Sequence, residues 1–274
     1  MRKIIAFNLL LMFSLAHSQV HRFYYEMVFK PTKDSAKTEK EMMVLDVAKD
    51  ESLFMSYKQL DYDSTLTAGI KKAQEMGAEL DAALMSKKPP ILSYRINKFK
   101  NGILKYKDFI GMSEYYVYEE KPNLKWNISS EKEKIGSYNT QKATTEFGGR
   151  QWTAWFTPEI PIQDGPYKFS GLPGLIVKIE DANQDYVWTL EANKKLSQNI
   201  DANKLNYLEF QMGEAMKISK EGFVKKRSEY RKNPMGQMSQ WFDEKNPELM
   251  KKLKEQESRE KDKLAHYSNI IEIN

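Results

Sequence analysis

Cysteine is absent from the 274 residues, and its absence excludes several kinds of site at once. The chain can form no disulfide and offers no thiolate to a metal. It also has no cysteine nucleophile and no lipobox cysteine to be acylated. Packing, hydrogen bonds and ion pairs must therefore stabilise the fold unaided.

Histidine is scarce as well, with three copies. His17 falls in the leader described next, which leaves His21 and His266 near the two ends of the chain. Ser–His–Asp catalysis would have to use one of these two. Ser170 lacks the G-x-S-x-G turn that exposes a nucleophilic serine, so we expect its hydroxyl to bond to nearby backbone. We expect no catalytic residue, no metal ligand and no cofactor.

Long apolar runs are confined to the N-terminus. Arg2 and Lys3 precede the apolar residues 4–15, and Ala16-His17-Ser18 supplies a cleavage site before Gln19. This order is typical of a secretory signal peptide, and the run is too short to span a bilayer. We predict a leader, residues 1–18, and a periplasmic or secreted mature chain without a membrane span.

Neither sign of charge is in large excess. The full chain carries +5, and loss of Arg2 and Lys3 with the leader leaves +3. A nucleic-acid partner needs basic residues gathered in one patch, so no such partner is expected.

Aromatic residues, in contrast, are plentiful, with fifteen tyrosines. Such residues favour half-buried strands. Alternating apolar positions predict ten or eleven short strands joined by hairpin turns, with the clearest turn signals at Asn101-Gly102 and Gly148-Gly149. The predicted strands are residues 22–29, 41–47, 52–57, 93–99, 103–109, 114–118, 124–128, 137–147, 151–157, 175–179 and 186–190, and residues 205–212 are a further candidate.

Three segments have a helical period instead. Residues 65–85 are expected to form a helix capped by Asp63 or Ser64 and ended by Pro89-Pro90. Residues 219–231 and 246–266 predict two more, the second opened by Asn246-Pro247-Glu248. Residues 269–273 are expected to end the chain as a short apolar strand that docks on the rest.

These elements predict an α+β fold that is mainly β. We expect a large curved antiparallel sheet with a helix over its concave side, comparable with the half-barrel of lipoprotein carriers. The expected divisions are the leader, residues 1–18, a β domain, residues 19–216, and a charged helical extension, residues 217–274.

Residues 157–176 are the most unusual stretch, with prolines at 158, 161, 166 and 173 and glycines at 165, 171 and 174. Neither a helix nor a central strand tolerates that composition. Apolar residues within it argue against disorder, so we predict a rigid, inward-packed connection between two hairpins. Valine in place of Gly171 or Gly174 is expected to impair folding before function.

This stretch also carries a family resemblance. Gly171-Leu172-Pro173-Gly174-Leu175-Ile176, preceded by Ala154-Trp155-Phe156-Thr157 and Gly165-Pro166-Tyr167-Lys168-Phe169, resembles the GLPGLI family of secreted Bacteroidota proteins. Residues 24–26, 52–54 and 269–273 are similar to the family's other segments. Asn139-Thr140 departs from the pattern near a position where many members have cysteine. The resemblance implies secretion and implies no activity, because none is established for the family.

Candidate binding residues cluster around the same stretch. Those selected are Arg150, Trp155, Glu159, Tyr167, Lys168 and Phe169. A second interpretation makes Arg150, Glu159 and Lys168 a salt-bridged clamp that holds the connection on the sheet. A third uses Glu159 and Asp164 as an acid–base pair, as in glycosidases. The aromatic members, together with Trp152 and Trp188, fit either a ligand cradle or the core.

Two short patterns have weaker alternatives. Asp181, Asn183 and Asp185 resemble the start of a calcium loop, but Tyr186 and Ala192 replace the required glycine and glutamate, which favours an ordinary hairpin turn. Asp34-Ser35-Ala36 fits a pattern for O-glycosylation in Bacteroidota.

The function favoured by these observations is non-enzymatic. We expect a secreted or periplasmic envelope protein that binds an apolar ligand, or an outer-membrane or periplasmic protein. A purely structural envelope component and a hydrolase using the loop carboxylates are the alternatives.

The predicted leader can be tested directly. Protein recovered from the periplasm or medium of its own host should begin at Gln19, because cleavage follows Ala16-His17-Ser18. Intact-mass and N-terminal sequencing would measure this. An N-terminus at Met1 in the exported fraction would contradict the prediction.

Overall fold

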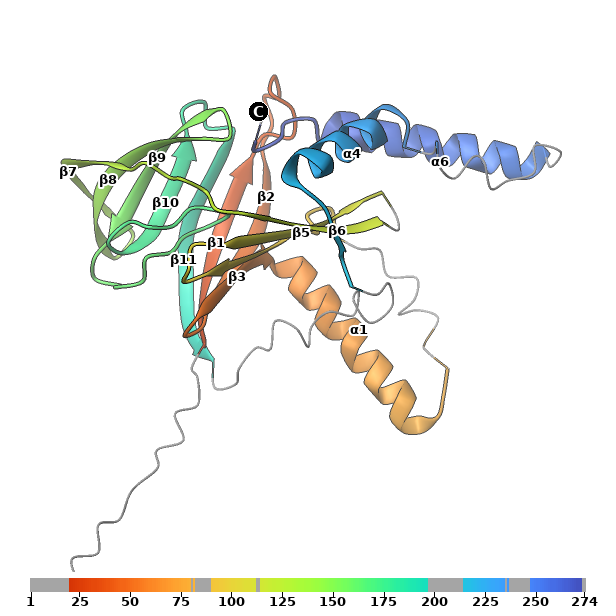
Figure 1. Ribbon diagram of the computed structural model, residues 1–274, viewed down its shortest axis with the longest axis horizontal. Helices are drawn as coiled ribbons and strands as arrows, with labels where there is room; N and C mark the ends of the chain where they lie inside the picture. Colours follow the sequence, from red (N-terminus) through yellow and green to blue (C-terminus); the bar gives the residue numbers. More distant parts are fainter. Residues whose placement is uncertain are drawn as a thin grey trace, which may run out of the picture.

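One sheet of twelve strands forms the body of the computed structural model (Figure 1). The structure describes residues 20–79, 81, 90–111, 114–196, 214–234, 236 and 247–272. Its strands are β1 (Val20–Phe29), β2 (Glu39–Val47), β3 (Glu51–Ser56), β4 (Arg95–Phe99), β5 (Leu104–Ile110), β6 (Glu114–Glu120), β7 (Asn127–Ile135), β8 (Tyr138–Phe147), β9 (Arg150–Thr157), β10 (Leu175–Asp181), β11 (Tyr186–Leu196) and β12 (Met216–Lys217). Its helices are α1 (Tyr57–Met76), α4 (Lys220–Lys232) and α6 (Pro247–His266).

Strand order follows from the short turns. The sheet runs β12-β6-β5-β4-β3-β2-β1-β11-β10-β9-β8-β7, and every pairing is antiparallel except that of β12 with β6. Hairpin turns force antiparallel neighbours, so most of the order repeats the order of the sequence. The long pairing of β1 with β11 joins the first three-strand meander to the later hairpins. The predicted mainly antiparallel α+β fold is confirmed.

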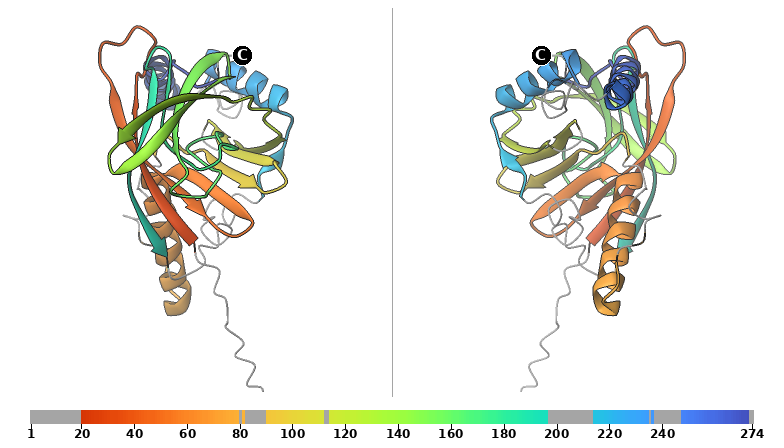
Figure 2. Two further views of the ribbon diagram at one scale, coloured as in Figure 1. Left: turned by 90° about the vertical axis from the view of Figure 1, so that its left-hand side faces the viewer. Right: turned by 90° about the vertical axis from the view of Figure 1, so that its right-hand side faces the viewer.

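The sheet is curved, and its inner face holds the main core. Figure 2 shows the sheet curling round the segment that joins β9 to β10, which we call the crossover (residues 158–174). Phe169 and Leu172 of the crossover are fully buried in the same cluster as Phe54, Trp152 and Trp188 of the strands. The inner face is therefore filled by the crossover rather than by the expected helix.

Helix α1 packs on the other face. Leu60 contacts Val44, Leu53 and Met55, which alternate along their strands with the inward residues. Buried residues of α1 lie only in its first half, and the rest projects away from the sheet (Figure 1). Because only the first half of α1 is buried, the helix contributes few side chains to the hydrophobic core.

The start of α1 differs from the prediction. Ser56 is the N-cap and accepts hydrogen bonds from the amides of Lys58 and Gln59, so the helix follows β3 without a loop. Asp63 is a buried residue inside the helix, where it pairs with Arg95 instead of capping. The first turns of α1 bury polar side chains, so the apolar periodicity of the sequence does not include these turns. Gly77, in a left-handed conformation, ends the helix.

The two later helices agree with the sequence. Ser219 caps α4, and α6 spans the predicted residues from Pro247 onward. No strand forms at residues 268–272, a segment we call the tail, whose backbone bonds to loops and side chains. The candidate strand 205–212 lies outside the described residues. None of the described helices has the length and apolarity to cross a membrane.

Internal hydrogen bonds make the crossover a defined structure. An isolated bridge joins Asp164 to Ser170, and the amides of Leu175 and Ile176 donate to the carbonyls of Ile160 and Asp164. Prolines supply no backbone donor, and the amides of Ile162, Asp164 and Gly171 donate to carbonyls inside the segment. The prediction of a rigid, inward-packed connection agrees with this arrangement.

The two motif glycines should respond differently to alanine. At Gly174, with φ of 154°, a Cβ would lie 2.1 Å from the Thr157 carbonyl oxygen, whereas at Gly171, with φ of 91°, it would meet open space. We expect Gly174→Ala to lower the free energy of unfolding by about 3 kcal/mol or more. Gly171→Ala should cost about 1–2 kcal/mol, from backbone strain alone.

Urea unfolding of both variants would measure the difference. Gly77→Ala, a left-handed helix cap in open space, serves as the control for backbone strain without a clash. Equal losses at Gly171 and Gly174 would contradict the structural account of the motif.

Candidate ligand-binding pocket

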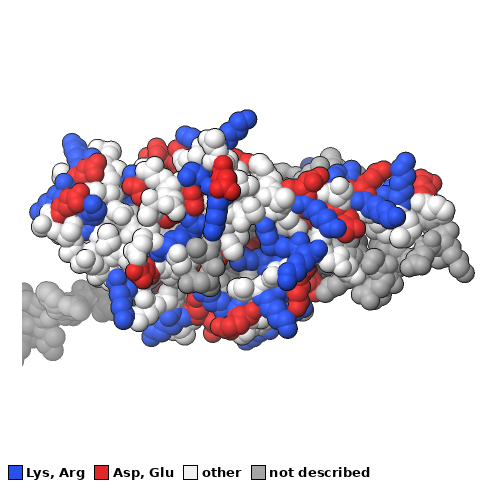
Figure 3. All heavy atoms as spheres, turned by 90° about the horizontal axis from the view of Figure 1, so that it is seen from above, with Lys and Arg blue, Asp and Glu red and all other residues white. Residues whose placement is uncertain are grey.

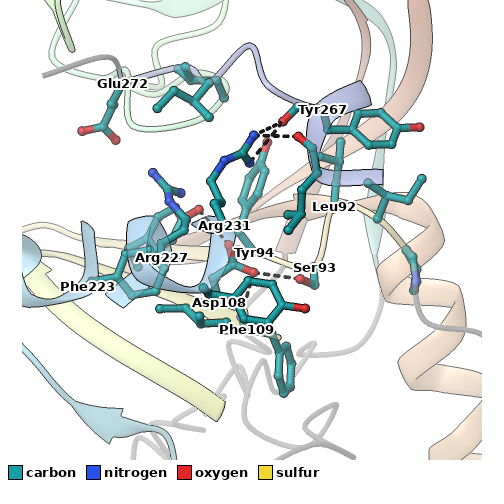
Figure 4. A pocket seen from close by; sticks show the side chains of 18 of the residues that line it. Leu92, Ser93, Tyr94, Asp108, Phe109, Phe223, Arg227, Arg231, Tyr267 and Glu272 are labelled. Carbon is teal, nitrogen blue, oxygen red and sulfur yellow. Dashed lines mark hydrogen bonds between the residues drawn. The ribbon is translucent and has the colours of Figure 1, made fainter. Parts of the chain in front are cut away.

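A cavity of about 700 Å³ lies between the inner face of the sheet, α4 and the tail (Figure 4). Strands β5 and β6 supply one wall, the crossover contributes Tyr167, and α4 contributes Phe223 and Arg227. Ligand sites in proteins are commonly concave spaces of this size with mostly apolar walls and a few placed polar groups. The cavity is therefore the candidate functional site.

Tyrosine rings form most of the apolar wall. Tyr106 stacks between Tyr94 and Tyr118, at ring-centroid distances of 5.8 Å and 5.0 Å. Phe223 of α4 meets Tyr106 edge-on at 5.7 Å. Tyr106 of β5 and Tyr118 of β6 lie directly opposite one another in adjacent antiparallel strands, so their rings stack. Tyr94, the residue before β4, adds its ring on the other side of Tyr106. The wall is consequently rigid, with an apolar surface suited to a flat or apolar ligand.

Tyr167 enters the cavity from a strained backbone. Its φ is 53°, which a residue with a bulky side chain rarely adopts. Its hydroxyl donates to Oε1 of Glu272 in the tail at 2.7 Å. Strain of this kind persists only where surrounding contacts hold it, and such sites are frequently functional.

Charged groups lie at the polar end of the cavity. Asp108 accepts hydrogen bonds from Ser93 Oγ at 2.7 Å, Tyr106 Oη at 3.1 Å and its neighbouring amide. Burial raises the pKa of the Asp108 carboxyl, and these donors offset part of that rise. Arg227 and Arg231 reach from α4 into the same space (Figure 4). Arg231 donates to the carbonyls of Leu264 and Tyr267 at the end of α6.

Lys168 lies behind this wall, and its side chain has no exposed surface. Its ammonium pairs with Glu120 of β6 and Glu272 of the tail, and it donates to Tyr118 Oη at 2.8 Å. Lys220 of α4 bridges the same two carboxylates at 2.8 Å and 2.6 Å, so two cations neutralise two anions. The cluster ties the crossover, β6, α4 and the tail together.

Aromatic rings complete the surroundings of Lys168. The rings of Tyr106, Tyr118, Tyr167 and Phe147 have centroids 5.0–5.9 Å from its Nζ. A desolvated ammonium is attracted to aromatic faces at this range. Burial lowers the pKa of Lys168, and the two carboxylates oppose that change.

Arg150 holds the other half of the tail. Its guanidinium pairs with Asp181 at 2.7 Å and with Asp185 at 2.8 Å. It also donates to the side chain of Asn269 and to the carbonyls of Ile270 and Ile271. Because Asn269, Ile270, Ile271 and Glu272 line the cavity, Arg150 and Lys168 together position one of its walls.

The predicted binding residues do not all meet. Tyr167 lines the cavity, whereas Lys168 and Phe169 lie behind the wall and Arg150 contacts the tail. Trp155 lies near Lys142, whose Nζ is 5.6 Å from the centroid of the Trp155 ring. Among the described residues, the cavity lining includes one of the six predicted side chains.

The proposed salt-bridged clamp is wrong in its membership. Glu159 accepts from the amide and side chain of Asn139, and it pairs with neither Arg150 nor Lys168. Lys168 and Glu159 are close in sequence but lie apart, because Lys168 points into the core while Glu159 contacts Asn139 of β8. The clamp exists with other carboxylates, from β6, the tail and the hairpin 181–185.

Sequence reasoning missed the polar residues that face the cavity. Asp108, Arg227 and Glu272 come from segments far apart in the chain, and only the fold brings them together. One usable signal was present, because Phe223, Arg227 and Arg231 recur every four residues and so share a face of α4. Such a stripe on a charged helix marks the side that packs inward.

The carboxylates of the hairpin at residues 181–185 take part in ion pairs. Asp181 and Asp185 both bind Arg150, and Asp181 also accepts from the amide of Tyr186. Among the described residues, no group of three His, Asp or Glu side chains could hold a metal ion. These contacts agree with the hairpin-turn interpretation.

Comparisons with known proteins add little about activity. A family model described as a protein of unknown function (Porph_ging) matches residues 147–178, the segment from the β8–β9 turn through the crossover into β10. No curated protein matches. Among solved structures, PNGF-II in two crystal forms is similar at 15% identity, with TM-scores of 0.52 and 0.51. The likeness covers 78% of this chain and 34% of that chain, and it concerns the fold alone.

Glu272 should make stability depend on pH. Burial alone would raise its pKa, but Lys168, Lys220 and Tyr167 outweigh burial and lower it to about 2, from an ordinary 4.5. A pKa depressed by folding stabilises the protein above pH 5, and this contribution is lost as the pH falls toward 2. The loss should be about 3 kcal/mol.

Urea unfolding between pH 6 and pH 2 would test this dependence. Glu272→Gln should flatten the acid fall in the free energy of unfolding, and Glu26→Gln, which removes an exposed ion pair with Lys40, should leave it steep. An unchanged acid profile in Glu272→Gln would contradict the role assigned to the cluster.

Proposed function

We propose that the mature chain is a non-enzymatic, periplasmic or secreted protein that binds a small ligand in the cavity. The observation that carries the proposal is a space of about 700 Å³ walled by stacked tyrosines and supplied with charged groups at one end. A purely structural component has no need of such a space, and a packed core would cost less to fold. Binding is therefore favoured over a structural role.

The sequence motif supports the same proposal indirectly. Residues 171–176 match the GLPGLI pattern, and we propose that the chain belongs to that family. The Porph_ging match includes Arg150, Tyr167 and Lys168, which line the cavity or hold the tail against it. We infer that the motif serves the binding site by fixing its wall.

The hydrolase alternative receives no support from the loop carboxylates. Asp164 pairs with Lys98 and accepts from Ser52 Oγ at 2.5 Å, while Glu159 bonds to Asn139. Neither carboxylate lines the cavity. A protein partner from the envelope is the alternative to a small ligand. The face seen in Figure 3 carries basic and acidic side chains side by side.

Native mass spectrometry of protein purified from its own host would test the proposal. We expect a co-purifying small molecule that denaturation releases. Val224→Trp should lower the bound fraction at least about tenfold, because Val224 lines the cavity yet is partly exposed, so a large ring there narrows the space without entering the core.

Lys225→Trp, on the same helix and outside the lining, is the matched control and should retain the ligand. A bare mass in the wild type, repeated after crosslinking, would contradict the proposal. Retention of the ligand by Val224→Trp would place the binding elsewhere.

A further inference from the structure

The Arg227 guanidinium stands out among the cations that line the cavity. Lys220 binds Glu120 and Glu272, Arg231 bonds to backbone carbonyls, and Lys263 pairs with Glu260. Arg227 has no hydrogen bond or ion pair within the part of the chain that the structure describes. It is partly buried, and its electrostatic neighbours are Tyr106, Asp108, Tyr167 and Tyr118.

An unpaired guanidinium in such a place favours an anion. Its five N–H donors form a planar fork that matches the two oxygens of a carboxylate. The centroid of the Phe223 ring lies 5.4 Å from Cζ of Arg227, so the ring packs against one side of the guanidinium. A charged donor that is partly buried without an acceptor carries a desolvation penalty that an exposed donor does not. A ligand that supplies the acceptor would offset this penalty.

The neighbouring charges limit the anion to one negative charge. The lining carboxylates Asp108, Glu260 and Glu272 offset three of the four lining cations, which are Lys220, Arg227, Arg231 and Lys263, so a second negative charge on the ligand would have no counter-charge in the lining. Arg227 is the one lining cation left without a described partner, so a single carboxylate balances it.

The rest of the ligand must suit the tyrosine wall. Tyr94, Tyr106 and Tyr118 present stacked rings, and Phe223 faces Tyr106 edge-on. Aromatic rings gain from such contacts beyond the burial of their area. The Tyr94 hydroxyl is buried and has no hydrogen-bond acceptor or donor among the described residues.

We infer that the cavity binds a monoanionic ligand whose carboxylate pairs with Arg227 and whose aromatic body lies against the tyrosine wall. The inference rests on the proposed function and adds the chemical class of the ligand. It also assigns to Arg227 a specificity role that neither the motif nor the family match contains.

Three probes with the same naphthalene ring separate the contribution of charge to affinity from that of the aromatic body. They are 2-naphthylacetate, 2-naphthylacetamide and 2-naphthyl phosphate. Isothermal titration of the mature chain should give 2-naphthylacetate the highest affinity, about tenfold above the amide, since a charge-assisted hydrogen bond contributes about 1.5–3 kcal/mol. The doubly charged phosphate should bind more weakly than the acetate.

Variants of α4 assign the effect to one residue. Arg227→Gln should weaken 2-naphthylacetate about tenfold and leave the amide unchanged. Lys225→Gln removes the same charge from the same helix outside the cavity lining and should change neither. Circular dichroism and thermal unfolding of each variant would show that α4 stays folded.

The outcomes separate the two proposals. Equal binding of acid and amide, or an Arg227→Gln variant that binds both as the wild type does, would overturn the anionic class and leave the cavity as a binding site. Tighter binding of the phosphate would overturn the single-charge argument. No binding of any probe, together with a bare native mass, would overturn both proposals.

Discussion

The buried ammonium of Lys168 is the interaction on which the arrangement of this protein depends. A charge with no exposed surface is stable only when its partners are fixed, and here Glu120 and Glu272 are fixed by different elements. Removing one partner of a buried ion pair costs about 3–5 kcal/mol. The crossover that carries Lys168 and the tail that carries Glu272 therefore stabilise one another.

This dependence explains how a Pro- and Gly-rich segment contributes to a binding site without supplying most of its lining. The crossover fills the inner face of the sheet and presents Tyr167 to the cavity, while Lys168 pulls Glu272 and the tail into place. Arg150 fixes the preceding tail residues through three of their oxygens. The cavity exists because the tail closes over the tyrosine wall instead of packing into it.

Local patterns predicted the elements well, and long-range pairing was out of their reach. Hairpin turns such as Asn101-Gly102 determine neighbouring strands, so the antiparallel sheet could be derived from alternation and turn chemistry. The start of α1 was misplaced because its first turns bury Gln59 and Asp63, which no apolar pattern reveals. Among the site residues, Tyr167 was found through its motif. Asp108 and Arg227 were missed because β5 and α4 meet only in three dimensions.

A double-mutant cycle between Lys168 and Glu272 tests the central claim most directly. The free energies of unfolding of Lys168→Met, Glu272→Gln and the double variant would be measured in urea at pH 7, with the exposed pair Lys40 and Glu26 as a reference cycle. We predict a coupling free energy of about 2 kcal/mol or more for the buried pair and less than about 0.5 kcal/mol for the exposed one. Additive effects at Lys168 and Glu272 would contradict the account, because the crossover and the tail would then be stabilised independently.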